Sequence, residues 1–239
     1  RRRNASFCFQ GAMMALVKEF RGGARAALPI VAAYLPVAFA LGAASSRLGF
    51  SVVESATWSL IMFSGANQAL MLSSIASGVS LVILALLCIA ASLRHVLYGL
   101  TLAHRIRARG VTRATFAYGL TDEVFATALT ADTRETQALP GPWLVGLAMT
   151  ALTAWVVATG LGNAVGDLLQ TRSQRLSETL DFALPALFLA LVWSAGRRSL
   201  LPPMALAAGL AGIMVAIGRP ELAVPAGALA AFLPSRSGE

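Results

Sequence analysis

The sequence predicts an all-α fold, a polytopic transmembrane helical bundle with about six spans and two broken or re-entrant segments. Two observations predict this class. Of the 239 residues, 57% are apolar and only 13% are charged, and the mean hydropathy is +0.71, so the polar surface is too small for a soluble globule of this size. The charged residues are also grouped, and they leave apolar intervals close to the roughly 20 residues that cross a bilayer as one helix.

The positive charge predicts the orientation. The net charge is +8, but the basic residues flank apolar intervals, which is typical of cytoplasmic loops in membrane proteins and not of a nucleic-acid-binding surface. Residues 1–25 therefore form a predicted basic cytoplasmic N-terminal segment, and "HRIRARGVTR" (104–113) is a second block on the same side. Residues 26–235 form a single transmembrane domain, and 236–239 form a cytoplasmic tail. We expect a multi-pass membrane protein with its N-terminus in the cytoplasm.

The first half of the domain contains three apolar intervals, at 26–46, about 55–72 and about 79–103. Because both basic blocks belong on one side, an even number of crossings separates them, and one of the three intervals fails to cross. The second interval contains "FSGANQALML" (63–72), whose middle is polar. Irregular backbone at membrane depth is tolerated only where protein or a water-filled cavity satisfies it. The interval 55–72 is therefore predicted to be broken or re-entrant.

The second half repeats this pattern. "ATFAYGLTDEVFATALTA" (114–131) is apolar at both ends and carries two carboxylates at its centre, so it is also predicted to turn back. Crossings at 141–166, 182–196, 199–218 and 222–235 then complete six spans, and seven follow if 114–131 crosses. Two interrupted segments favour a carrier built from internal repeats. An inverted repeat is compatible with this pattern, although no residue-level self-similarity supports it. "GNAVG" (162–166) matches GxxxG but is given no weight in a chain so rich in glycine and alanine.

Polar residues within the apolar intervals are the candidates for function. Ser64, Gly65, Asn67 and Gln68 interrupt the second interval, where they either bind a polar solute or join helices through amide hydrogen bonds. A second group consists of the charged residues Arg94, Asp122 and Glu123. Each costs about 2.5 to 3.5 kcal/mol if unpaired at a helix centre, so such groups usually line a solute path or face a partner. The alternatives are an arginine that snorkels at the end of its span and carboxylates in a cytoplasmic loop.

Nothing in the sequence indicates a catalytic residue, a metal site or a cofactor. Cys8 and Cys88 are far apart, and His95 and His104 form no metal-binding spacing. An acid-base enzyme within the membrane would have to use Asp122, Glu123 and His95, without a nucleophile motif or a soluble domain. The chain is therefore expected not to be an enzyme.

Four stretches together, in this order, resemble the AzlC/YgaZ family, the large subunit of the branched-chain amino acid exporters. They are "LPIVAAYLPVAFALG" (28–42), "FSGANQAL" (63–70), "SLRHVLYGL" (92–100) and "GLTDEVFA" (119–126). The likeness covers roughly residues 20–235. Two residues depart from the family pattern, which often has a small residue at the position of Asn67 and asparagine at that of Ser92; these changes leave the substrate preference open.

The resemblance implies a secondary transporter that exports valine, leucine and isoleucine, with methionine as a further candidate, by alternating access. It also implies a small hydrophobic partner subunit of the AzlD type. Backbone amides with Ser64, Asn67 and Gln68 are expected to bind the substrate carboxylate, with help from Arg94. Asp122 or Glu123 would bind the ammonium group or carry a coupling proton in a proton antiporter. The expected side-chain pocket is formed by Phe39, Met62 and Phe63. A carrier or channel for another small solute, and a purely structural subunit, are the alternatives.

Overall fold

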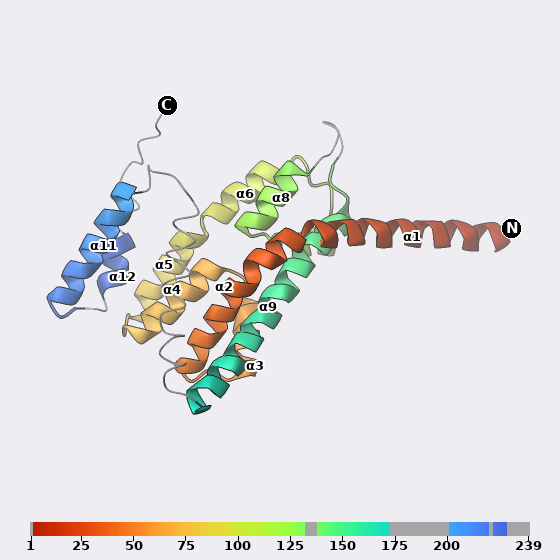
Figure 1. The fold of residues 1–239 in the computed structure, drawn as a ribbon. Helices are drawn as coiled ribbons and strands as arrows, with labels where there is room; N and C mark the ends of the chain where they lie inside the picture. The colour runs from red at the N-terminus through yellow and green to blue at the C-terminus, as the bar shows by residue number, and fades with distance from the viewer. Residues whose placement is uncertain (1, 132–137, 173–200, 220–221, 229–239) are drawn as a thin grey trace.

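The computed structural model describes residues 2–131, 138–172, 201–219 and 222–228, and all regular secondary structure in these ranges is helical (Figure 1). The all-α prediction is thus confirmed for this part of the chain. Within it, three helical stretches have the length and hydropathy to cross a membrane: Leu28–Arg47, Leu81–Leu102 and Gly141–Gly166. These coincide with the predicted crossings 26–46, 79–103 and 141–166.

The helices follow one another with short connections. Those up to the second broken segment are α1 (Arg2–Ala26), α2 (Leu28–Arg47), α3 (Val52–Ile61), α4 (Gly65–Ala76), α5 (Leu81–Ser92), α6 (Arg94–Leu102), α7 (Gly110–Tyr118) and α8 (Asp122–Thr130). The remaining ones are α9 (Gly141–Arg172), α11 (Leu201–Ala216) and α12 (Ala223–Ala228). The predicted crossing 182–196 lies outside the described residues, as does the second half of 222–235. The count of six or seven spans and the inverted repeat therefore stay predictions.

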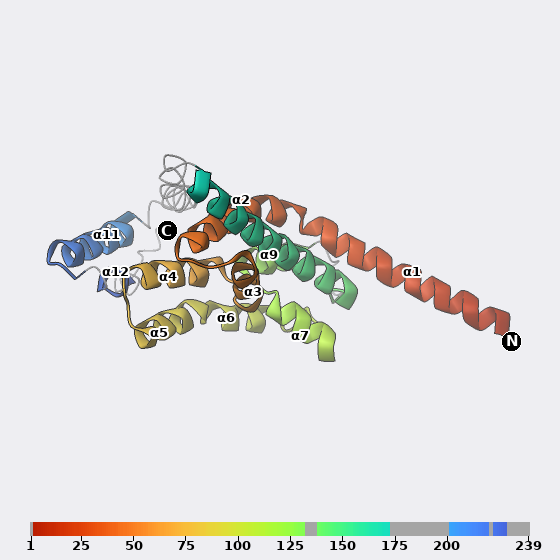
Figure 2. The same cartoon turned by 90° about the horizontal axis from the view of Figure 1, so that it is seen from below.

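Helices α2 and α9 form the centre of the bundle and lie side by side (Figures 1 and 2). A Cβ on Gly42 would lie 2.0 Å from the carbonyl oxygen of Thr159, and one on Gly162 would lie 2.0 Å from that of Phe39. Only glycine allows the two backbones to approach this closely. A Cβ on Gly166 would also meet α2, so the "GNAVG" motif packs against this helix, although its spacing alone did not predict a contact.

The contacts along this pair show that the two helices run parallel. Gly23, just before α2, lies against the carbonyl group of Trp143 near the start of α9, whereas Gly42 lies against Thr159 farther along. The connection before α2 and the start of α9 are consequently at the same end of the bundle. Helix α1 packs its last turns against α9 there, and its remainder projects away from the bundle (Figure 1).

The first predicted interruption is present between α3 and α4. Helix α3 ends at Ile61, the backbone at residues 62–64 is extended or irregular, and α4 begins at Gly65. The chain turns back at this break into a helical hairpin, whose two arms are linked where Nε1 of Trp58 on α3 donates to the sulfur of Met71 on α4 over 3.1 Å. This hairpin starts beside the end of α2, and its tip points into the bundle.

The second interruption lies between α7 and α8, at residues 119–121. Thr112 near the start of α7 touches Gly141, and a Cβ on Gly119 at its end would lie 2.7 Å from that of Ala148, so α7 runs inward along α9. Helix α8 returns to the starting end, where the Arg105 guanidinium donates to the carbonyl groups of Ala128, Leu129 and Ala131. The segment turns back, as predicted.

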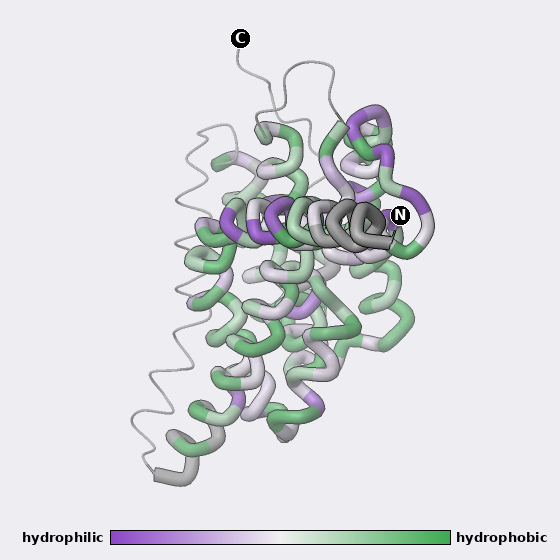
Figure 3. The backbone as a smooth tube through the Cα atoms, turned by 90° about the vertical axis from the view of Figure 1, so that its right-hand side faces the viewer, coloured by the Kyte–Doolittle hydropathy of each residue, from purple (hydrophilic) through white to green (hydrophobic). Residues whose placement is uncertain are grey.

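Helices α5 and α6 form an almost continuous span with a local tightening at Leu93, which keeps helical dihedral angles. The large apolar side chains of this span are mostly exposed in the isolated chain, as expected for a surface that faces lipid or another subunit. Figure 3 shows that hydrophilic residues gather on α1 and beside it, whereas the bundle is mostly hydrophobic.

Candidate functional site

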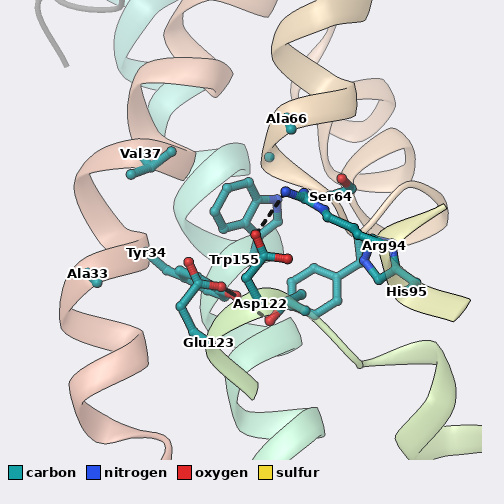
Figure 4. A pocket seen from close by; sticks show the side chains of 13 residues that line it. Ala33, Tyr34, Val37, Ser64, Ala66, Arg94, His95, Asp122, Glu123 and Trp155 are labelled. Atoms are coloured by element: carbon teal, nitrogen blue, oxygen red, sulfur yellow. Dashed lines mark hydrogen bonds and ion pairs between the residues drawn. The ribbon is translucent and has the colours of Figure 1, made fainter. Parts of the chain in front are cut away.

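The tips of the two hairpins meet at one cavity of about 240 Å³. Helix α2 forms one wall, α9 contributes Trp155, and the start of α6 closes another side (Figure 4). The lining residues are Ala33, Tyr34, Val37, Phe63, Ser64, Gly65, Ala66, Arg94, His95, Thr121, Asp122, Glu123 and Trp155. Trp155 lies about 21 Å along α9 from Gly141, which is near the middle of that span. The cavity is smaller than the roughly 300 to 1,000 Å³ of drug-sized sites, so it suits a small solute.

An ion pair joins two sides of the cavity. Nη1 of Arg94 lies 2.9 Å from Oδ2 of Asp122, and the two side chains point toward each other in Figure 4. The Tyr98 hydroxyl donates to Oδ1 of Asp122 over 3.0 Å, so both carboxylate oxygens have partners. The Arg94 and Asp122 side chains are 38% and 43% exposed, which leaves them accessible from the cavity. Nε of Arg94 is buried and has no partner among the residues that the structure describes, so this guanidinium has a donor to offer.

A second chain of hydrogen bonds holds Glu123. The Tyr34 hydroxyl donates to Oε2 of Glu123 over 2.6 Å and lies 2.6 Å from Oγ1 of Thr121. Because the single phenolic hydrogen goes to Glu123, the Thr121 hydroxyl must donate to Tyr34. Thr121 also accepts from the backbone N–H of Val124 and so caps α8. Helix α2 and the tip of the second hairpin are therefore joined through Tyr34.

Both returning half-helices begin at the cavity. Ser64 caps α4 and Thr121 caps α8, each by accepting from the backbone N–H three residues later. The first turn of α8 carries Asp122 and Glu123, which are favourable at the positive end of a helix dipole, whereas the first turn of α4 carries no acidic residue. An anion in the cavity would therefore find its open helix terminus at α4, where Gly65 and Ala66 line the wall.

Gln68 supports the tip of the first hairpin from behind. Its Nε2 donates to the carbonyl oxygen of Met62 over 2.8 Å and to Oγ of Ser59 over 3.1 Å, and its Oε1 accepts from Nε1 of Trp155 over 3.1 Å. The side chain is 0% exposed. The Met62 carbonyl group belongs to the irregular backbone of the break, so this amide satisfies a group that the interrupted helix leaves open.

The structure brings six of the ten predicted site residues to the cavity wall. They are Phe63, Ser64, Gly65, Arg94, Asp122 and Glu123. The other four do not line it. Gln68 donates from Nε2 to the Met62 carbonyl oxygen. Asn67 donates from Nδ2 to Oγ of Ser92 over 2.9 Å. The backbone of Phe39 packs against Gly162.

Sequence reasoning missed Tyr34, Trp155 and Thr121. Tyr34 and Trp155 are single aromatic residues in apolar stretches, where packing is the default interpretation, although each has a polar group that needs a partner when buried. The need of these polar groups for a hydrogen-bond partner was the feature of the sequence that could have pointed to a polar site. Thr121 precedes an acidic pair at the start of a helix, which is a capping pattern. Within the described residues, no group of three or more His, Cys, Asp or Glu side chains could hold a metal ion.

A helical bundle with three helices long and apolar enough to cross a membrane, and with a cavity between two interrupted helices, defines a polytopic α-helical membrane protein. Comparisons with known proteins agree with this class. The family model "AzlC protein" matches residues 29–169. The chain therefore belongs to the AzlC family, as the sequence motifs predict.

Individual relatives support the assignment. The chain is 40% identical over 198 residues to the "Inner membrane protein YgaZ" of Escherichia coli (strain K12), which covers 81% of each chain. It is 36% identical over 173 residues to an uncharacterized membrane protein of Archaeoglobus fulgidus, covering 72% of this chain and 74% of the relative. It is 23% identical over 172 residues to the "Branched-chain amino acid transport protein AzlC" of Bacillus subtilis (strain 168), covering 72% and 66%. No solved structure matches the chain.

Proposed function

We propose that this chain is a secondary transporter that exports branched-chain amino acids by alternating access. The observation that carries the proposal is the meeting of two half-helix N-termini, one bare and one acidic, at a single small cavity. Discontinuous helices whose termini face a midplane cavity are the recurrent substrate sites of secondary transporters. The AzlC family of this chain includes a protein named for branched-chain amino acid transport.

The two polar ends of an amino acid match the two sides of this cavity. The carboxylate fits the start of α4, where Ser64, Gly65 and Ala66 line the cavity and the helix dipole is positive. The ammonium group fits Glu123, whose carboxylate has Tyr34 as its hydrogen-bond donor. Arg94 and Asp122 largely neutralise each other, so the remaining charge on this side comes from Glu123. A zwitterion is therefore a better match than a simple anion.

The aliphatic side chain needs an apolar wall, and the cavity supplies one. Ala33 and Val37 of α2 line it on one side, and Phe63 and Trp155 lie on another. Phe63, 8% exposed, and Trp155, 3% exposed, meet edge to face with ring centroids 6.2 Å apart, so the wall is firmly packed. The predicted roles of Phe39, Met62, Asn67 and Gln68 become supporting ones in this proposal, because these residues hold the hairpin tip and the α2–α9 contact in place.

Competitive counterflow tests the proposal. The purified chain, with its AzlD-type partner where stability requires it, is reconstituted into liposomes loaded with unlabelled L-valine, and entry of labelled L-valine is measured. We expect exchange that leucine and isoleucine inhibit, and that valinamide and isovalerate do not, because each of these lacks one charged end. Equal inhibition by isovalerate would refute recognition of the ammonium group. Chemical conversion of valine would instead indicate an enzyme.

Proton antiport is the coupling that we propose, with Asp122 or Glu123 as the carrier of the proton. Both carboxylates line the cavity, and both are hydrogen-bonded to tyrosines on membrane-spanning helices. Asp122→Asn and Glu123→Gln together should abolish valine flux driven by a pH gradient. Glu19→Gln, on α1 and away from the cavity, is the control. Unchanged pH-driven flux in the double variant would rule out this coupling.

We further propose that the chain resides in the bacterial cytoplasmic membrane with its N-terminus in the cytoplasm. The basic residues of α1 and of residues 104–113 lie at one end of the bundle, as the positive-inside rule requires of cytoplasmic segments. Cysteine introduced at position 107 in a variant lacking native cysteines should be labelled only from the cytoplasmic side. The AzlD-type partner is proposed for the exposed apolar surface of α5 and α6, and loss of transport without that subunit would support it.

A further inference from the structure

A second cavity lies outside the transport site, where α1 crosses the start of α9. This groove, of about 480 Å³, is formed by α1, α7 and α9. Its lining residues are Leu16, Val17, Phe20, Arg21, Thr112, Pro142 and Val145. Five of the seven are apolar, and Arg21 is the one charged residue among them. The groove therefore combines an apolar floor with a cation at its edge.

The position of the groove corresponds to a membrane interface. Trp143 lies near the start of the span Gly141–Gly166, where aromatic residues commonly mark the boundary between hydrocarbon and headgroups. A Cβ on Gly22 of α1 would lie 3.3 Å from the Trp143 ring, so α1 passes at this level. From there α1 projects away from the bundle (Figure 1). Its apolar side chains next to the groove are exposed in the isolated chain, including Leu16 at 53% and Phe20 at 40%.

The charges around the groove favour an anionic occupant. On α1, Lys18, Arg21 and Arg25 are exposed, and residues 104–113 add further exposed arginines at the same end of the bundle. Within α1 and residues 104–113, Glu19 is the one acidic residue. Basic pockets between membrane helices on the cytoplasmic side are suited to anionic lipid headgroups, and an amphipathic basic helix at the interface is suited to an anionic lipid surface.

We infer that this groove binds an anionic phospholipid, with an acyl chain along Leu16, Phe20 and Val145 and the headgroup phosphate at Arg21. The Thr112 hydroxyl, at the start of α7, offers a further donor to the phosphate. A soluble phosphate would leave the apolar floor exposed to water, and a zwitterionic lipid would gain less from the surrounding cations. The lipid would thereby join α1 to α7 and α9. This site is separate from the transport cavity and does not depend on the proposed transport function.

Native mass spectrometry of the full chain in detergent tests the inference, with phosphatidylglycerol and phosphatidylcholine of identical acyl chains as the probes. We expect tighter binding of phosphatidylglycerol. Arg21→Gln should weaken it about fivefold or more, the factor that corresponds to about 1 kcal/mol for one arginine at an anionic surface. Val145→Trp, which fills the groove without a change of charge, should weaken it to a similar degree. Both variants should keep the elution volume and melting temperature of the parent chain.

Lys18→Gln is the matched control, because Lys18 is exposed on α1 but does not line the groove. We expect it to change binding less than twofold. Equal effects of Lys18→Gln and Arg21→Gln, with none from Val145→Trp, would mean diffuse attraction and overturn the site. Equal binding of the two lipids would overturn the preference for an anion. Displacement of the lipid by equimolar glycerophosphoglycerol, the headgroup without chains, would show that a free phosphate suffices and would also overturn the proposal.

Discussion

Trp155 on α9 donates a hydrogen bond from Nε1 to Oε1 of Gln68 on α4, over 3.1 Å. This contact ties the helix at the centre of the bundle to the tip of the first hairpin. Gln68 also holds the interrupted backbone, because its Nε2 donates to the Met62 carbonyl oxygen in the break between α3 and α4. The ring of Trp155 lines the cavity, so the Gln68 amide positions both the interrupted backbone and part of the cavity wall.

Gln68→Leu should lower the free energy of unfolding by about 1 kcal/mol or more. The substitution leaves the buried Trp155 indole N–H and the part-buried Met62 carbonyl group without these partners, and an unsatisfied buried group costs about 1 to 3 kcal/mol. Thermal melting in detergent provides the measurement. Ser73→Ala, at an exposed position of the same helix, should change little. Equal melting temperatures for Gln68→Leu and Ser73→Ala would contradict the role of Gln68.

Gly65→Ala should reduce valine exchange strongly while the protein still folds. The added Cβ would lie 2.8 Å from Cη2 of Trp155, so the indole ring must shift into the cavity or lose its bond to Gln68. Gly99→Ala on α6 is the matched control, because its Cβ would meet no atom of the described residues within 4 Å. That variant should keep its exchange rate and gain up to about 1 kcal/mol in stability from the better helix former. Normal exchange by Gly65→Ala would show that the ring position is not critical.

Tyr34→Phe should weaken valine binding, because it removes the hydroxyl that joins Thr121 and Glu123. Hydrogen bonds to charged groups contribute about 1.5 to 3 kcal/mol, so a loss of affinity of about tenfold or more is expected. Tyr118→Phe makes the same chemical change at a tyrosine that is 47% exposed and does not line the cavity. Isothermal titration with valine compares the two. If both variants bind valine equally, Glu123 does not need Tyr34 for its orientation.

Arg105→Gln should loosen the second hairpin at the end of α8. The guanidinium donates to three carbonyl groups there, at Ala128, Leu129 and Ala131, and a cation is favourable at the C-terminus of a helix. Hydrogen exchange of the α8 amides should accelerate severalfold. Arg107→Gln, at an exposed position two residues away, should leave exchange unchanged. Uniform acceleration in both variants would point to general loss of charge instead of loss of the cap.

Much of the architecture was predictable from where polar residues interrupt apolar ones. The broken segments at 55–72 and 114–131 follow from Gly, amide and carboxylate groups at membrane depth, which are costly unless the chain turns there. Of the six predicted residues that line the cavity, five lie at these two interruptions, and Arg94 lies at the start of α6. The α2–α9 contact was not predictable, because glycines at packing and non-packing positions look alike in the sequence until the partner helix is known.

The side-chain directions at the site were also not predictable. Asn67 and Gln68 are adjacent to residues that line the cavity, yet both point into packed protein, where Ser92, Ser59 and Trp155 satisfy them. A helix turns about 100° per residue, so neighbours in sequence face different partners. Tyr34 and Trp155 show the reverse, because they were not predicted to line the cavity and do so. Their aromatic rings suggested packing alone, and their polar atoms proved to organise the cavity.

The backbone contact of α2 with α9 has a mechanical consequence. At Gly42 and Gly162, backbone carbonyl groups of one helix lie against the Cα atoms of the other. No flexible side chain lies between them that could adjust if the helices slid past each other, so we expect α2 and α9 to move as one rigid body. Among the described helices that line the cavity, the two hairpins are therefore the parts best placed to move if the cavity opens first to one face of the membrane and then to the other. The first hairpin enters the bundle beside the end of α2, and the second enters beside the start of α9. Each hairpin is therefore placed to open or close the cavity toward the membrane face from which it enters.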